Sequence, residues 1–251
     1  MSSPAARSVR MSSLMLGRSP KGPGTALSDG VVPSAKVAYG LAGQVHAAIR
    51  GDDLLLLSIA SGQYFCVPAA GAGLRLKDGS NEVAIQDHDL AEVLVSGGFI
   101  EALSTPSPRP PSPGHVRRDA QLSPYRLDPW ATVRLTAAAT ISAAVGFHGR
   151  SFAHLVAAAG ARSGLGHTDL AQSEKVAGRF LAALPWVPSQ GDCLYRSFVL
   201  HALLSREGLN AAWVFGVQTW PFEAHCWLQV EDVVLDDTCD HVSSFTPILV
   251  V

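Results

Sequence analysis

A run of prolines is the feature that most restricts how this chain can fold. Five of the eleven residues from Ser104 to Gly114 are proline, namely Pro106, Pro108, Pro110, Pro111 and Pro113. Proline lacks a backbone N–H and fixes φ, so this stretch predicts an extended, semi-rigid linker without a packing face. We therefore expect a small module at residues 31–103, a linker at 104–114 and a larger domain at 115–251.

The composition predicts a soluble, cytoplasmic protein. Hydrophobic residues make up 47% of the chain, although residues 1–30 are rich in Ser, Pro and Gly and are expected to be a disordered tail. The N-terminus lacks the apolar core of a secretory signal, and the run from Leu135 to Phe147 is too short to span a bilayer. A net charge of −2 gives no bias towards nucleic acid, and four cysteines are too few for a disulfide scaffold.

The first module has the pattern of a small β-then-α unit. Short apolar runs at 45–49, 54–59 and 64–67 are separated by turn residues, which predicts a three-stranded meander. Asp87 then precedes a short apolar pattern that stops at Gly97-Gly98, as a capped helix would.

The larger domain has the pattern of an α+β fold with a helical front and an antiparallel sheet. Helices are predicted at about 129–145, 151–161, 168–184 and 193–206, and strands at 211–217 and 225–236. Gly208 follows the last helix at the position that a left-handed cap requires.

Cys193 heads that last helix. Unpaired N–H groups and the positive end of the helix dipole favour a thiolate there. Asp192 is expected at the N-cap, where its charge opposes the thiolate. Most free cysteines are simply small buried residues, so Cys193 becomes a candidate nucleophile only if it has a partner.

Two histidines are candidates for that partner. His201 lies eight residues along the same helix, a rise of about 12 Å, which excludes it if the helix is continuous. His225 opens a strand and can face a cleft, and the aspartates Asp236 and Asp237 follow it. The order Cys, His, Asp is that of a nucleophile, its base and the group that orients the base.

Strand alternation does not choose between the two aspartates. A two-residue turn at Glu231-Asp232 places Asp236 on the face of His225, whereas a three-residue loop places Asp237 there. Gln190 is a candidate oxyanion donor or an ordinary loop residue. No metal site is expected, because Cys226, Cys239 and His241 lack zinc-ligand spacing and adjacent strand residues point to opposite faces.

Residues 125–251 resemble the transglutaminase-like cysteine peptidases that mature lasso peptides. The resemblance is carried by short motifs: Cys193-Leu194-x-Arg196-Ser197, Leu203-Leu204-x-Arg206-x-Gly208, His225-x-Trp227 and a carboxylate twelve residues after His225. It implies a papain/transglutaminase-like fold and a catalytic set of Cys193, His225 and Asp237. Cys226 departs from the family, which usually has Ala after the histidine.

The first module resembles the winged-helix-like leader-recognition domain of enzymes that modify ribosomally made peptides. The matching residues are Ser61-Gly62-Gln63-Tyr64-Phe65 and Gly98-Phe99-Ile100. The resemblance implies that a precursor's leader binds as an added strand at the sheet edge. Tyr64, Phe65 and Cys66 lie on the strand expected to form that edge, although such aromatics are more often part of a core.

Together the two resemblances imply a leader peptidase that acts on a precursor peptide beside an asparagine-synthetase-like lasso cyclase. No cofactor is expected in this chain, and any ATP requirement would come through the cyclase. Two alternatives remain open: a thiol acyltransferase that forms amides, as transglutaminases do, or a peptide-binding scaffold without catalysis.

Overall fold

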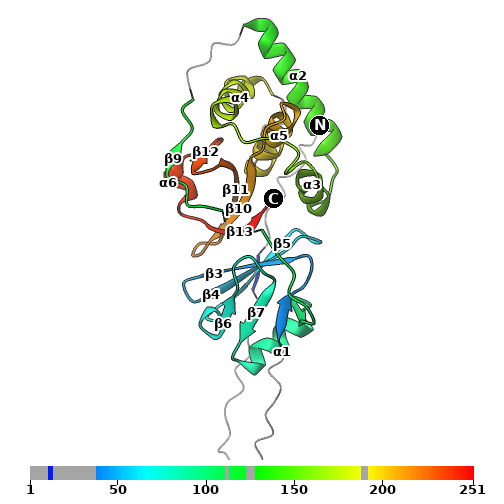
Figure 1. Ribbon diagram of the computed structural model, residues 1–251, viewed down its shortest axis with the longest axis vertical. Coiled ribbons are helices and arrows are strands. Elements are labelled where there is room, and N and C mark those ends of the chain that lie inside the picture. Colours follow the sequence, from blue (N-terminus) through cyan, green and yellow to red (C-terminus); the bar gives the residue numbers. More distant parts are fainter. Residues whose placement is uncertain (1–10, 14–37, 111–112, 123–127, 188–191) are drawn as a thin grey trace, which may run out of the picture.

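The computed structural model describes residues 11–13, 38–110, 113–122, 128–187 and 192–251. A strand-rich N-terminal part and a helix-rich C-terminal part lie end to end along its longest axis (Figure 1). The α+β fold class predicted from the sequence is confirmed.

The predicted meander is present as three antiparallel strands, β3 (Val45–Arg50), β4 (Asp53–Ser58) and β5 (Gln63–Val67). A fourth strand, β1 (Met11–Ser13), pairs in parallel with the outer edge of β5. The expectation of a disordered tail is therefore wrong at these three residues, because the unpaired N–H and C=O groups of an edge strand can order a passing segment. The rest of the expected tail, apart from β1, lies outside the described residues.

The module also contains a second sheet that the sequence pattern did not reveal. Its strands, in spatial order, are β6 (Leu74–Leu76), β7 (Glu82–Ile85), β2 (Tyr39–Leu41) and β8 (Ile100–Ala102). They are too short to show alternation. A single 3₁₀ turn, η1 (Gly71–Gly73), and one α-helix, α1 (His88–Ser96), accompany the two sheets in the described part of the module. Asp87 caps α1 as predicted, by accepting from the N–H groups of Asp89 and Leu90.

The β4 strand holds the two parts together because both of its faces are buried. Leu54 and Leu56 pack into the module's own core, whereas Leu55 and Leu57 belong to the core of the C-terminal part. A continuous leucine run is what a strand buried on both sides needs. Polar contacts also cross the boundary: Arg50 donates to Thr246 at 3.1 Å and Trp220 donates to Asp53 at 3.0 Å.

The proline-rich stretch is not the free linker that we expected. Ser107 exchanges hydrogen bonds with Asn81, and Pro108 forms a β-bridge with Ser80. Arg109 donates to the carbonyl oxygens of Val45 and Ala42 at 2.6 and 3.2 Å. This stretch is therefore fastened to the first module, because its carbonyls and the Arg109 guanidinium meet backbone groups that the short strands leave unpaired.

The helical front has the predicted elements. They are α2 (Pro129–Gly146), α3 (Phe152–Gly160), α4 (Leu170–Ala183), the 3₁₀ turn η2 (Leu184–Trp186) and α5 (Cys193–Arg206). The side chains of Asp128, Ser151 and Asp169 cap the first three helices. Gly208, with φ of +73°, follows α5 as expected.

The C-terminal sheet has the strand order β13-β10-β11-β12-β9. Its elements are β9 (Arg118–Asp119), β10 (Ala212–Gln218), β11 (Glu223–Val230), β12 (Val233–Val234) and β13 (Thr246–Val250), with the short helix α6 (Cys239–Val242) before the last strand. The α5 helix packs on one face of this sheet, and β13 lies against β3 of the first module (Figure 1).

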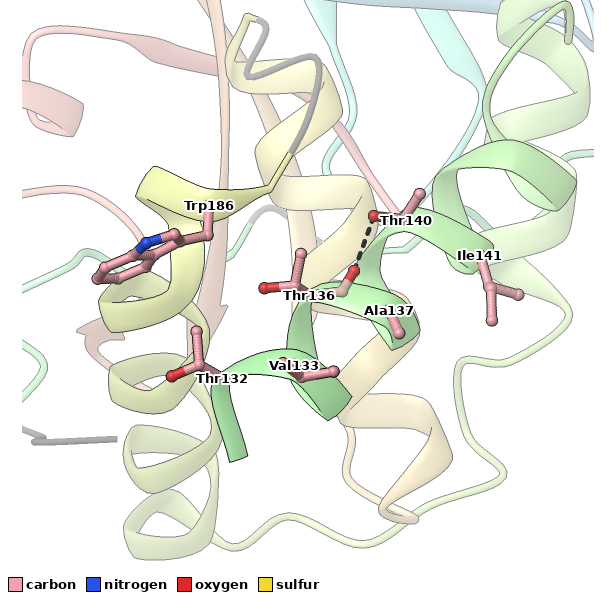
Figure 2. Close-up of a pocket in the computed structure, with 7 residues that line it drawn as sticks. All are labelled: Thr132, Val133, Thr136, Ala137, Thr140, Ile141 and Trp186. Atoms are coloured by element: carbon pink, nitrogen blue, oxygen red, sulfur yellow. Dashed lines mark hydrogen bonds between the residues drawn. The ribbon is translucent and has the colours of Figure 1, made fainter. Parts of the chain in front are cut away.

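The outer face of α2 is apolar and exposed. Val133, Ile141 and Trp186 line a groove of ≈ 480 Å³, in which Thr140 donates its hydroxyl to the carbonyl of Thr136 at 2.7 Å (Figure 2). Among the described residues, no helix combines the length and apolar character that crossing a bilayer requires.

Candidate active site

The packing of α5 on the sheet places Cys193 beside β11. Phe198 and Leu200 of the helix share one buried cluster with Phe215 and Leu228 of the sheet. Asp192 occupies the N-cap position, but its side chain makes no capping hydrogen bond, contrary to expectation. The N–H groups in the first turn of α5 are therefore not capped by Asp192 and stay available to another acceptor.

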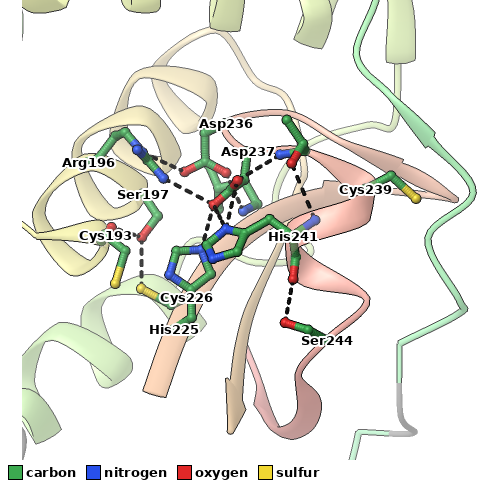
Figure 3. Close-up of polar contacts among 12 residues, drawn as sticks. Cys193, Arg196, Ser197, His225, Cys226, Asp236, Asp237, Cys239, His241 and Ser244 are labelled. Carbon is green, nitrogen blue, oxygen red and sulfur yellow. Dashed lines mark hydrogen bonds and ion pairs between the residues drawn. The ribbon is translucent and has the colours of Figure 1, made fainter. Parts of the chain in front are cut away.

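His225 bridges Cys193 and Asp237. Its Nε2 lies 2.6 Å from Oδ2 of Asp237 (Figure 3), and its side chain also lies near enough to Cys193 for each group to shift the pKa of the other. Because Asp237 holds Nε2, Nδ1 is the nitrogen left to face the thiol. The structure thus brings together a thiol, an imidazole and a carboxylate in the order that a cysteine nucleophile uses.

The side chain of Asp236, by contrast, points away from His225. The turn at Glu231-Asp232 has two residues, which by alternation favoured Asp236 as the partner of His225. Alternation fails because β12 ends at Val234. Oδ1 of Asp236 accepts from the N–H of Leu228 at 2.8 Å, and so takes the place of the backbone carbonyl that a continuing strand would supply. The chain beyond this point turns Asp237 towards the imidazole.

Arg196 lies against both aspartates. Its Nε is 3.8 Å from Asp236 and its Nη2 is 3.4 Å from Asp237. Burial raises the pKa of Asp236 to about 6, although the Leu228 N–H and Arg196 oppose this rise. Arg196 stands three residues after Cys193 and therefore lies on the same side of the helix. This spacing is the sequence signal by which Arg196 could have been identified as a residue of the site.

Asp237 is held by more partners than a triad requires. Burial alone would raise its pKa, but hydrogen bonds from His225, the Thr238 N–H and His241 bring the pKa well below its usual range. His241 Nδ1 lies 3.0 Å from Oδ1 of Asp237. The sequence pattern gives His241 no such role, although its position four residues after Asp237, within α6, fits this contact.

These contacts favour an ion pair between the thiol and the imidazole. A hydrogen bond from the Cys226 side chain, opposed by burial and helped by His225, lowers the pKa of Cys193 to about 4. Burial would lower the pKa of His225, but hydrogen bonds to Asp237 and Cys193 raise it to about 9. At neutral pH the site therefore holds a thiolate and an imidazolium.

The family comparison agrees with this geometry. Residues 137–250 match the model of the transglutaminase-like superfamily. This part of the chain is a transglutaminase-like domain. The match includes Cys193, His225 and Asp237 and fits cysteine peptidases and acyltransferases in general. No curated protein and no solved structure matches the chain.

The first module reaches the thiols of the transglutaminase-like domain through Tyr64. This side chain is buried in the same cluster as Cys226, and its ring centroid lies 5.7 Å from that of Phe222. Burial, together with the charges of Cys226 and Cys193, raises the pKa of its phenol. Tyr64 is therefore part of the surroundings of the active site.

The other expected leader contacts lie in different places. Cys66 is fully buried towards the transglutaminase-like domain, and Phe65 points the opposite way, against Phe99. Their backbone groups, not their side chains, form the edge that pairs with β1. Gln190, the candidate oxyanion donor, lies outside the described residues.

One further cluster includes the base. Single ligand atoms of His225, Asp237 and His241 lie within 4.8 Å of one another. The hydrogen bonds among these three side chains already account for their closeness, so we assign no metal to them.

Proposed function

We propose that this chain is a cysteine peptidase that removes the leader from a ribosomally made precursor during lasso-peptide biosynthesis. The observation that carries the proposal is the Cys193–His225–Asp237 arrangement in a transglutaminase-like domain. The sheet edge beside it supports peptide binding, because it accepts an added strand.

The ion pair sets the order of the chemical steps. The Cys193 thiolate attacks the scissile carbonyl, and the His225 imidazolium then gives its proton to the leaving amine as the C–N bond breaks. The product is a thioester between Cys193 and the leader. Neutral His225 next takes a proton from water, whose oxygen attacks the thioester, and the leader leaves as a free acid. Asp237 keeps the imidazole in position in both halves of the cycle.

The leader is proposed to bind along β5. Met11, Ser12 and Ser13 pair there with Tyr64, Phe65 and Cys66, so the backbone groups of this edge are able to pair with an added strand. Backbone pairing gives such a site affinity without demanding particular side chains. A leader strand at this edge would replace β1. It would pair with β5, the strand whose Tyr64 is buried in the same cluster as Cys226.

The proposed partners are the precursor and an asparagine-synthetase-like cyclase that uses ATP. The chain itself is proposed to need no cofactor, because a thiolate, an acid–base imidazole and water are sufficient for the hydrolysis. The cytoplasm, where thiols stay reduced, is the proposed location.

Incubation with a candidate precursor, with and without the cyclase and ATP, tests the proposal. We expect mass spectrometry to show a free leader acid with the unaltered chain and intact precursor with Cys193→Ala. Cys239→Ala is the matched control, since Cys239 is a nearby thiol outside the triad. Equal cleavage by Cys193→Ala would contradict the proposal.

Amide formation is the second candidate function. It is favoured by the match to a transglutaminase-like model, because an amine can resolve the same thioester in place of water. Adding a primary amine to the reaction separates the two: hydrolysis leaves the leader as an acid, whereas acyl transfer couples the leader to the amine.

A third candidate, a peptide-binding scaffold without catalysis, predicts an inert Cys193. Alkylation of Cys193 at neutral pH much faster than that of Cys226 and Cys239 would exclude it.

A further inference from the structure

A second thiol lies against the proposed nucleophile. Cys226 follows His225 on β11 and is only 2% exposed. Its side chain and its backbone N–H both lie near enough to the sulfur of Cys193 to lower the pKa of that thiol. Figure 3 shows the two sulfur atoms side by side, with Ser197 above them.

The hydrogen bonds of Ser197 indicate where the proton of Cys226 goes. Its hydroxyl donates to the carbonyl oxygen of Cys193 at 2.7 Å and accepts from Nε1 of Trp213 at 2.8 Å. Its oxygen also lies 3.3 Å from the sulfur of Cys226. Because the one hydroxyl proton is directed to the Cys193 carbonyl, the S–H of Cys226 is the proton left to act as a donor among these groups.

The surroundings of the two thiols separate their ionisation. Burial, with the contact to Cys193 and the charge of Asp236, raises the pKa of Cys226 well above its usual value, although Ser197 opposes this. Cys193 has both the imidazolium of His225 and the Cys226 side chain beside it, and both lower the pKa of its thiol. When the pKa values of two neighbouring groups are shifted in opposite directions, one group acts as an anion and the other as a neutral donor.

We propose that Cys226 donates its S–H to the Cys193 thiolate and shares with His225 the task of holding the nucleophile. The Cys226 backbone N–H supplies a further donor to the same sulfur. A hydrogen bond to an ionised acceptor is stronger than one between neutral groups, so the thiolate is a better acceptor for this proton than the Ser197 oxygen.

This role would matter when water releases the thioester. The sulfur then leaves as a thiolate in the same half of the cycle in which His225 takes a proton from water, so the imidazolium and the Cys226 S–H stabilise the leaving sulfur together. A donor that does not titrate also holds the thiolate in place before it attacks the next peptide bond. The inference deepens the proposed function and rests on it for this step, because the same sulfur attacks the peptide bond.

The test measures ionisation of Cys193 without any peptide. Alkylation by iodoacetamide is followed between pH 3.5 and 8 for the full chain, Cys226→Ala and Cys226→Ser, and the Cys193 peptide is quantified by mass. We expect Cys226→Ala to raise the midpoint by one unit or more, which is about tenfold slower alkylation below the midpoint. Cys226→Ser should keep the midpoint near that of the unaltered chain, because a hydroxyl also donates.

Two results would overturn the proposal. One is an unchanged midpoint in folded Cys226→Ala, and the other is an equal rise in both variants, which would indicate a packing role. If Cys226→Ala does not fold, Cys226→Ser alone decides, since a raised midpoint contradicts the proposal and an equal or lower one supports it. If the chain cuts no precursor, the proposed function is contradicted. The midpoint of Cys193 alkylation still tests the role of Cys226, because that measurement uses no peptide.

Discussion

The active site and the edge of β5 differ in what they are built from. The candidate active site depends on particular side chains, because the proposed chemistry uses a thiol, an imidazole and a carboxylate in contact with one another. The β5 edge depends on backbone N–H and C=O groups, which almost any residue supplies. Side-chain substitutions should therefore strongly lower activity at the active site and have little effect on binding at the β5 edge. At that edge, only a change in backbone pairing should alter binding.

One strand nevertheless connects the two regions. Tyr64 and Cys66 of β5 pack into the core that surrounds Cys226, while the backbone of the same residues pairs with β1. A leader strand bound at the edge would thus touch the strand that contributes Tyr64 to the active-site surroundings. The predictions below test this contrast between side-chain and backbone sites.

Cys193→Ala should have the largest effect. Loss of a triad nucleophile lowers kcat by about 10⁶-fold, so leader removal should fall below detection while leader binding stays unchanged. Cleavage rate and leader affinity, the latter by fluorescence anisotropy, are measured on the same preparations. A loss of leader affinity as large as the loss of cleavage would contradict the prediction that binding and cleavage depend on different regions.

The adjacent aspartates should respond in opposite ways to the same substitution. Asp237→Asn should lower kcat by about 10²- to 10⁴-fold, because the imidazolium loses the anion that orients it.

Asp236→Asn should keep most of the activity but lower the free energy of unfolding by about 1–3 kcal/mol, because the buried Arg196 Nε loses its anionic neighbour. Rates and denaturant unfolding curves of both variants check the pair. An exchange of the two outcomes would show that Asp236, and not Asp237, serves His225.

The pH dependence of kcat/KM should report the ion pair. Activity should fall as the pH drops through about 4, where Cys193 gains a proton, and as it rises through about 9, where His225 loses one. Both values belong to the coupled pair, and each further unit should cost about tenfold. An acid limb near the ordinary pKa of a thiol would contradict a preformed thiolate.

Removal of residues 1–14 should have the smallest effect. It deletes β1 and frees the β5 edge, so the leader should bind about 2- to 10-fold more tightly, because no internal strand competes. Deletion of residues 1–8, which leaves β1, is the matched control. Equal or weaker binding after the longer deletion would show that the leader binds elsewhere.

The parts of the fold with local signals could be predicted from the sequence. Asp87, Ser151, Asp169 and Gly208 mark helix ends through caps that depend on a few neighbouring residues. The β2, β6, β7 and β8 strands carry no such signal, since each has only three or four residues and its pairing comes from distant segments.

The site could be predicted only in outline. Residue types and order suggested Cys193 and His225, but the choice of aspartate depended on a side chain, Asp236, replacing a backbone group. Strand alternation also placed Cys226 away from His225. The start of α5 nevertheless brings Cys193 into contact with both, which depends on helix packing that one sequence does not reveal.

Covalent labelling by a leader peptide tests the central claim most directly. A leader that carries a vinyl sulfone in place of the scissile carbonyl should add one equivalent to the chain, on Cys193, with activity lost in proportion. The same reagent without the leader should react much more slowly. Label on Cys66, Cys226 or Cys239, or full activity after complete labelling, would contradict Cys193 as the nucleophile of a leader peptidase.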